Sequence, residues 1–233
     1  MSDNAELFLG IFNEVEKFLT NNFNNGKHAS FRYLLIKASR SHPIIKKYRN
    51  DLITYGDLRN AIMHNFNKDG EAIAIPRDKI VKHFTEIWEQ ISNPQKVNMF
   101  FKKVYTCNIN DTLEMALDLI HEHKILQLPI IENNLIIDVL NSLQIVEWLS
   151  GIKEVKPSET IISEILNSST NRQNFAIIPE NYTVFQAAEL YKESFRRFPK
   201  NRYYDALLIT KSGKENQPLL GIIVLKDIAA YLN

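Results

Sequence analysis

The sequence predicts an α+β protein: an N-terminal all-α helical bundle followed by two copies of a β-α-β-β-α repeat. The first observation is internal similarity, because residues 104–149 and 175–232 align when Thr112 is set against Thr183. The second is helical periodicity over the first 95 or so residues. Together they place a helical domain at 1–95 and the repeat pair at 96–233, with repeat one at about 98–150 and repeat two at about 158–233.

Both copies contain the same five segments in the same order. After each threonine, apolar residues have the i, i+3, i+4, i+7 spacing of one buried helix face. These residues are Leu113, Ala116, Leu117 and Ile120 in the first copy and Val184, Ala187, Ala188 and Tyr191 in the second. The predicted strands are 104–107, 128–131 and 135–140 in the first copy and 175–178, 206–209 and 219–224 in the second, with closing helices at 142–149 and 226–232.

Turn-forming residues divide the first domain into separate helices. Thr54 and Asp57 resemble a capping box, so we expect a helix that begins after Thr54 and continues to about Asn65. Pro76 suits the first position of the last helix. The other expected segments are helices at 7–19 and 31–37, a helical piece after 43, a loop at 67–75 and a short linker at 94–101. Because the linker is short, we expect the two domains to be mechanically coupled.

The end of the third strand carries the most specific signal in each copy. Residues 221–227 read Gly-Ile-Ile-Val-Leu-Lys-Asp, and residues 138–144 read Asp-Val-Leu-Asn-Ser-Leu-Gln. The second copy resembles the pattern of the CBS domain, which is roughly Gly, two apolar residues, Thr or Ser, two variable residues and Asp, except that it has Val at the hydroxyl position. The first copy departs further, with Asp138, Asn141 and Gln144 at the three defining positions. The pair therefore resembles a tandem CBS pair, or Bateman module.

This resemblance implies a regulatory ligand. In Bateman modules the repeats pack through their sheets, and clefts between them bind adenine-containing molecules, so we expect AMP, ADP, ATP or S-adenosylmethionine and no required cofactor. The acid of the pattern, Asp227, would hold the ribose hydroxyls; the simpler interpretation is an acid favoured by a helix N-terminus. The expected ligand set is Asp227, Lys226, Val224, Ile178, Thr106 and Asn141. The cleft built on Gln144 should be weak or empty. The basic insertion at 196–202 either reaches ligand phosphates or is a solvated loop.

A second group of polar residues lies on the helix predicted at 54–65. Asn60 and His64 are four residues apart and share a face, and Arg59 is long enough to reach that face. A guanidinium binds phosphate oxygens through paired hydrogen bonds, and an imidazole exchanges protons near neutral pH. This trio resembles the Arg-x4-6-His motif of HEPN domains. The resemblance implies catalytic roles for Arg59, Asn60 and His64 in a metal-independent endoribonuclease, with two motifs meeting in a homodimer.

The same trio has a plainer interpretation, because Arg and His at this spacing also occur by chance, and many HEPN-like domains are not catalytic. Residues 27–50 contain seven basic residues and no acid, which is either an electrostatic footprint for RNA or a solvated face. Two functions therefore remain. One is a CBS-domain regulator that senses an adenine-containing ligand and controls a HEPN-like RNA-binding or RNA-cleaving domain. The alternative is a non-catalytic dimeric interaction or scaffold protein with a ligand-binding or degenerate CBS pair.

Composition sets broad limits on location and chemistry. The formal net charge of +1 gives no global argument for nucleic acid or membrane, and the single cysteine, Cys107, excludes an internal disulfide. His121 and His123 are two apart on a predicted helix and so lie on different faces, and we expect no metal site. No apolar run approaches membrane-spanning length, and the first residues do not resemble a signal peptide. We therefore expect a cytoplasmic protein.

Overall fold

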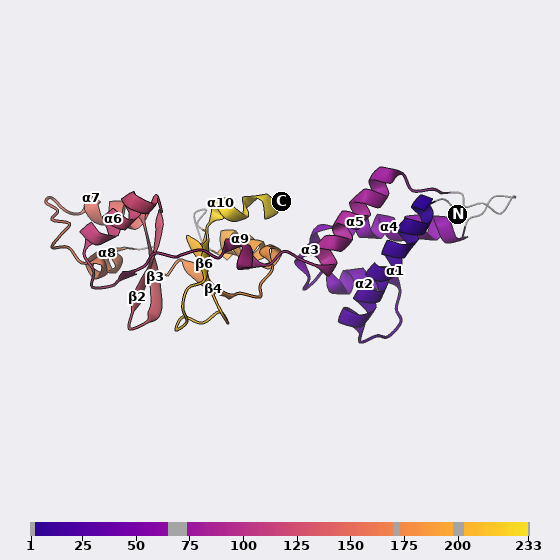
Figure 1. Cartoon of the computed structure of the whole chain (residues 1–233), viewed down its shortest axis with the longest axis horizontal. Coiled ribbons are helices and arrows are strands. Elements are labelled where there is room, and N and C mark those ends of the chain that lie inside the picture. The colour runs from indigo at the N-terminus through magenta and orange to yellow at the C-terminus, as the bar shows by residue number, and fades with distance from the viewer. Residues whose placement is uncertain (1–2, 65–73, 170–172, 198–202, 233) are drawn as a thin grey trace. The chain divides into compact units, whose positions relative to one another are not determined.

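The computed structural model describes residues 3–64, 74–169, 173–197 and 203–232. The chain divides into two compact units, Met1–Gln95 and Lys96–Asn233. Strands occur in the second unit, whereas the described part of the first is helical (Figure 1). No helix of the described residues is both long and apolar enough to cross a membrane.

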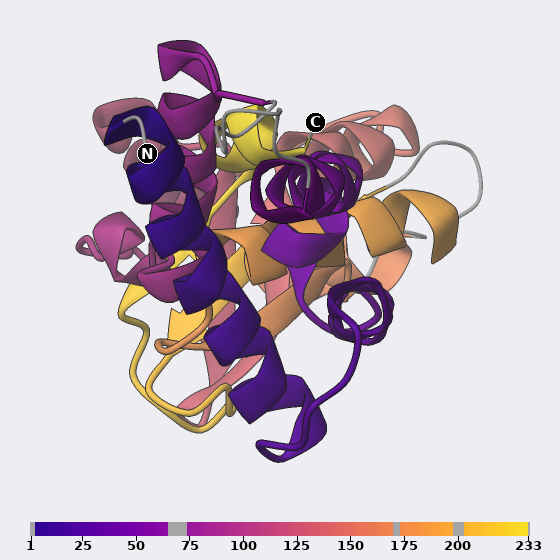
Figure 2. The same cartoon turned by 90° about the vertical axis from the view of Figure 1, so that its right-hand side faces the viewer.

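The first unit is built around α1, the long indigo helix of Figure 2. Every third or fourth residue of α1 is buried, which gives it one apolar face. Phe8 on that face packs against the rings of Tyr55 and Phe84, with ring centroids 5.8 Å and 5.1 Å away. The helices are α1 (Asp3–Asn24), α2 (Phe31–Ala38), α3 (Pro43–Lys47), α4 (Arg49–His64) and α5 (Asp78–Ser92).

Two predicted helix starts in this unit are wrong. Helix α4 begins at Arg49, and the Thr54 hydroxyl donates to the Asn50 carbonyl oxygen (3.0 Å) inside the helix. A threonine can bond four residues back in this way as well as cap a helix, so a capping pattern alone does not fix the start. Helix α5 begins at Asp78, two residues after Pro76. Most of the loop predicted at 67–75 lies outside the described residues.

The second unit contains two sheets of three strands with the same topology. In each sheet the first strand is parallel to the second, and the second is antiparallel to the third. The strands are β1 (Cys107–Asn108), β2 (Gln127–Glu132) and β3 (Leu135–Asn141), then β4 (Phe175–Pro179), β5 (Ala206–Thr210) and β6 (Gly221–Ile223). The helices are α6 (Leu113–His123), α7 (Ser142–Ser150), α8 (Ile162–Ser168), α9 (Val184–Arg197) and α10 (Leu225–Ile228), with 3-10 turns η1 (Val97–Phe100) and η2 (Ala229–Tyr231).

The two aligned threonines have the same structural role. The Thr112 hydroxyl accepts a hydrogen bond from the Met115 N–H (3.3 Å), and the Thr183 hydroxyl accepts one from the Gln186 N–H (3.1 Å). Each therefore caps the helix that follows it. The predicted buried face is complete in α9, whereas in α6 Leu117 is 38% exposed and leaves the face incomplete.

Each repeat is completed by the segment that leads into the other one. The η1 turn belongs to the second repeat: the Val97 N–H donates to the Tyr182 carbonyl (2.9 Å), and Phe101 bridges to Gly221. Helix α8, which the sequence analysis did not predict, packs its buried face into the core of the first repeat. Strand β1 begins at Cys107, at the end of the strand predicted at 104–107, and residues 101–102 just before that prediction pair with the second repeat.

The exchange also changes where the linker attaches. Helix α5 ends at Ser92, and Lys96 already bridges to Thr183 of the second repeat. Only residues 93–95 therefore separate the last helix of the first unit from a segment anchored in the second repeat. The linker predicted at 94–101 is therefore shorter in the structure, because residues 96–101 are already part of the second repeat.

The two sheets face each other across a shared apolar core. Ile136 and Val139 of β3 pack with Leu208 of β5 and Ile222 of β6. The segment that precedes each repeat passes the third strand of the other repeat at the same pattern position: residues 100–101 pass Gly221, and residue 173 passes Asp138. In the second repeat, the Phe100 carbonyl oxygen would lie 2.5 Å from a Cβ added at Gly221. In the first repeat the matching residue is Asp138, whose buried carboxylate accepts from the Gln173 N–H (3.0 Å).

We expect Cys107 to be unreactive in the folded protein. Its side chain is 2% exposed, and burial, with a smaller contribution from the Asp111 carboxylate, raises the pKa of its thiol to about 11. At pH 8 a pKa of about 11 instead of 9.0 lowers the thiolate fraction about 100-fold. An aromatic disulfide reagent should therefore label Cys107 in urea and leave it unlabelled in buffer. The raised pKa also means that this thiol's stabilising contribution is complete below pH 9 and is lost as the pH rises toward 11.

Candidate ligand-binding cleft

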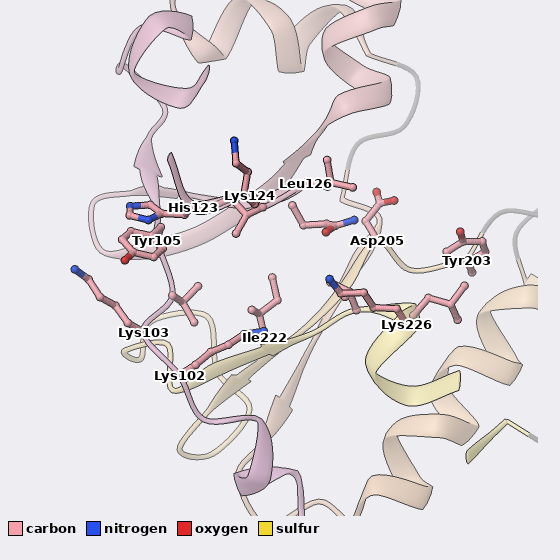
Figure 3. Close-up of a pocket in the computed structure, with 15 residues that line it drawn as sticks. Lys102, Lys103, Tyr105, His123, Lys124, Leu126, Tyr203, Asp205, Ile222 and Lys226 are labelled. Atoms are coloured by element: carbon pink, nitrogen blue, oxygen red, sulfur yellow. The ribbon is translucent and has the colours of Figure 1, made fainter. Parts of the chain in front are cut away.

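A cavity of about 530 Å³ lies between the two repeats. That volume is within the usual range for small-molecule sites. The crossing segment 102–105 runs from the second repeat to the first, the first repeat contributes the 123–127 turn between α6 and β2, and the second contributes residues around the β6–α10 junction (Figure 3). Because each wall comes from a different repeat, a ligand bound here would contact both.

Cations surround this cleft. Lys102, Lys103, Lys124 and Lys226 line it, and all four are exposed. In Figure 3, Lys102 and Lys226 extend into the space between the repeats, whereas Lys124 points away from it. Lys124 adopts the left-handed conformation (φ 52°) that ends α6. The cleft therefore offers two inward cations and two more at its margin.

The wall formed by the first repeat is flat and aromatic. Tyr105 and His123 stack with ring centroids 3.6 Å apart and an interplanar angle of 15°. The Lys103 ammonium lies 4.8 Å from the Tyr105 centroid. Apolar side chains from both repeats complete the lining: Val104, Ile125, Ile222 and Val224. Rings and apolar side chains suit the face of a nucleobase, and ammonium groups suit phosphates.

Asp205 is the one acid among the described residues that line the cleft. Its Oδ2 accepts a hydrogen bond from Nδ2 of Asn141, which belongs to the first repeat (2.8 Å). Asn141 is the N-cap of α7: its Oδ1 accepts from the Gln144 N–H, and its own N–H donates to Gln144 Oε1, both at 2.9 Å. These bonds fix which end of the Asn141 amide faces Asp205.

The cleft brings together two of the six ligand residues expected from the sequence. Lys226 and Val224 line it. Asp227 follows Lys226 in the sequence but does not line the cavity. Its Oδ2 accepts from the Val224 N–H (3.0 Å) at the start of α10. Asn141 lies behind Asp205, and Ile178 is buried in the second repeat's own core. Thr106 is half-buried beside Tyr105 and does not line the cavity.

Sequence reasoning missed most of the polar lining. Lys102 and Lys103 directly precede the first strand, and this adjacent pair is the signal that could have indicated a cationic rim. No local sequence pattern marks Asp205 as a cleft residue, because the hydrogen bond that orients it comes from Asn141 of the other repeat. Of the basic insertion at 196–202, residues 198–202 lie outside the described part of the chain.

In the first unit, Arg59 and Asn60 line a separate cavity of about 470 Å³. The Arg59 guanidinium donates to Asn60 Oδ1 (3.3 Å) and lies 5.6 Å from the centroid of the Phe12 ring. His28 lines the same cavity. His64 is the last residue of α4, and its side chain is not among the parts of the chain that the structure describes.

Comparison with known proteins now bears on the second unit. Residues 98–151 match the CBS domain family. The matched CBS domain is the first repeat, which departs further from the short family pattern than the second does. No curated protein matches the chain. The resemblance of the first unit to HEPN domains stays a prediction.

Solved structures similar to this chain include three CBS-domain proteins. One is a conserved CBS domain protein of unknown function from Thermoplasma acidophilum (17% identity, 60% of this chain and 70% of that chain covered, TM-score 0.44). Another is CBSX2 in complex with AMP (16%, 58% and 95%, TM-score 0.41). The third is the CBS domain of a bacterial CNNM/CorC family Mg²⁺ transporter in complex with ATP (18%, 64% and 92%, TM-score 0.44).

Proposed function

We propose that residues 96–233 form a tandem CBS pair, or Bateman module, that binds an adenine nucleotide between its repeats and regulates the rest of the chain. The observation that carries this proposal is the cleft itself, which has walls from both repeats. Its stacked rings and apolar residues suit a base, and its lysines suit phosphates. The family match of residues 98–151 supports the same assignment for the first repeat.

We expect an adenine nucleotide to raise the melting temperature of the full-length protein. A ligand that binds only the folded state stabilises it by about 2.7 kcal/mol at 100 times its Kd. Thermal unfolding should be followed with AMP, ADP, ATP and S-adenosylmethionine. Lys226→Ala should reduce the nucleotide-dependent shift, because it removes a cation from the cleft. Lys153→Ala removes an exposed lysine that does not line the cleft and serves as the matched control. If none of the four compounds shifts the wild type, the sensing function is wrong.

A second function is favoured by the juxtaposition of Arg59 and Asn60 at one cavity of the helical unit. We infer that this unit acts on RNA in a homodimer. Arg59 would bind the phosphate, Asn60 would orient the guanidinium, and His64, from the last turn of the same helix, would transfer the proton. Since only residues 93–95 join α5 to the segment anchored in the second repeat, a nucleotide-dependent change in the repeats would reach this unit through a short connection.

Arg59→Ala and His64→Ala should each reduce RNA cleavage at least about 100-fold if this unit is an endoribonuclease. Cleavage of a mixed RNA substrate should be measured with EDTA present, with and without ATP. Arg77→Ala, which removes an exposed arginine next to α5, should leave the rate unchanged. A wild type that cleaves no RNA would favour the non-catalytic, scaffolding alternative. Equal rates with and without ATP would mean that the nucleotide does not control cleavage.

A further inference from the structure

The cleft contains its acid at a position that the CBS pattern does not specify. Asp205 precedes β5, whereas the acid of the pattern, Asp227, lies in α10 and directs Oδ2 to the Val224 N–H. Among the described residues that line the cavity, Asp205 is the one carboxylate, and lysines stand on both walls around it. Figure 3 shows Asp205 and Lys226 on the same side of the cavity.

A residue of the opposite repeat holds this acid. Asn141 is 6% exposed, and both its backbone N–H and its Oδ1 are engaged with Gln144. With Oδ1 accepting from the Gln144 N–H, the Nδ2 donor is directed to Asp205 Oδ2 at 2.8 Å. This bond orients Asp205, whose half-buried side chain lines the cavity, and a carboxylate can accept several hydrogen bonds on its two oxygens.

We propose that Asp205, positioned by Asn141, binds the sugar hydroxyls of the ligand, and that the surrounding lysines select a nucleoside polyphosphate. This inference rests on the proposed nucleotide-binding function and names the ligand class and the residue that distinguishes it. Ionised carboxylates accept strong hydrogen bonds from vicinal hydroxyls, because charge-assisted bonds are roughly twice as strong as neutral ones. Asn141 stands at the hydroxyl position of the first-repeat pattern and acts here as a positioning residue.

The lysines argue for several phosphates. Lys102, whose N–H donates to the Leu220 carbonyl, and Lys226 both extend between the repeats from the wall of the second repeat, and Lys103 and Lys124 stand at the margin. One phosphate cannot neutralise cations that are spread over both walls, whereas a triphosphate spans several ammonium groups. The sulfonium cation of S-adenosylmethionine would add positive charge to a cleft that already contains four lysines and one acid. The charge balance therefore favours ATP over AMP and over S-adenosylmethionine.

Calorimetric titration of the full-length protein with ATP, 2′,3′-dideoxy-ATP and AMP tests this inference. The wild type should bind ATP at least about tenfold more tightly than either analogue. Asp205→Asn should bring the affinities for ATP and dideoxy-ATP to about the same value, and Asn141→Ala should reduce the difference between them. Loss of folding or of cleft shape would instead weaken both ligands equally and preserve their ratio. The preference for ATP over AMP should shrink as ionic strength rises.

Asp118→Asn, an exposed acid on α6 outside the cleft, is the charge-matched control and should preserve the hydroxyl preference. Asp227→Asn is the competing variant. If it abolishes the hydroxyl preference while Asp205→Asn preserves it, the inference is overturned and the proposed nucleotide-binding function stands. Equal affinities for AMP and ATP would overturn the ligand class alone. If no adenine nucleotide binds the wild type, the proposed function fails and this inference fails with it.

Discussion

Gly221→Ala is expected to destabilise the repeat unit by about 3 kcal/mol. A Cβ at this position would lie 2.5 Å from the Phe100 carbonyl oxygen and 3.1 Å from its carbonyl carbon. Both contacts are with backbone that is fixed in place, because Phe101 bridges to Gly221 and the Lys102 N–H donates to the Leu220 carbonyl (3.1 Å). The clash can be relieved only by moving the lead-in segment away from β6.

Urea unfolding followed by tryptophan fluorescence measures this effect. The protein has two tryptophans, so a Trp88→Phe background leaves Trp148, in the core of the first repeat, to report on the second unit. Gly10→Ala is the matched control: nothing lies within 4 Å of a Cβ at this helical position. Alanine is the better helix former, but Gly10 lies in the first unit, so this control should leave the unfolding midpoint reported by Trp148 unchanged. An unfolding midpoint for Gly221→Ala equal to that of its background would contradict the prediction.

The parts of the fold that depend on local pattern were predictable from sequence. The sequence alignment of the repeats pairs Thr112 with Thr183, and both residues are helix caps. A capping hydroxyl and the apolar spacing after it act within one helical turn, so a single sequence is enough to show them. The division into a helical N-terminal part and a part with CBS-like sheets follows from the same kind of signal.

The parts that depend on the crossing of distant segments were not predictable. Nothing in residues 96–101 indicates that they pair with the second repeat, because the partner residues lie about 85 to 120 positions away in the sequence. The position of Asp205 depends on Asn141 in the same way. Helix α8 is short, and its buried face becomes apparent only against the core of the first repeat.

The departure of Asp138 from the family pattern has a structural cause. At the matching position of the second repeat, Gly221 leaves room for a carbonyl of the crossing segment. In the first repeat, Gln173 of the crossing segment presents an N–H instead, and Oδ1 of Asp138 accepts it at 3.0 Å. The same Oδ1 also accepts from the Val139 N–H (2.9 Å). The residue at the first position of the pattern thus differs with the backbone group that it faces: glycine faces a carbonyl in the second repeat, and aspartate accepts from an N–H in the first.

Restoring the family glycine with Asp138→Gly is therefore expected to destabilise the repeat unit by about 3 kcal/mol. The carboxylate is fully buried, so its removal deprives the buried Val139 N–H and the Gln173 N–H of a charged acceptor, and glycine adds conformational freedom to the unfolded chain. Asp138→Asn keeps an oxygen acceptor and should lose only about 1 kcal/mol. Both variants are measured by urea unfolding in the Trp88→Phe background. Gln173 lies in the segment that leads into β4, so this bond connects the second repeat to the first. A glycine variant as stable as its background would show that the crossing segment is held by its other contacts alone.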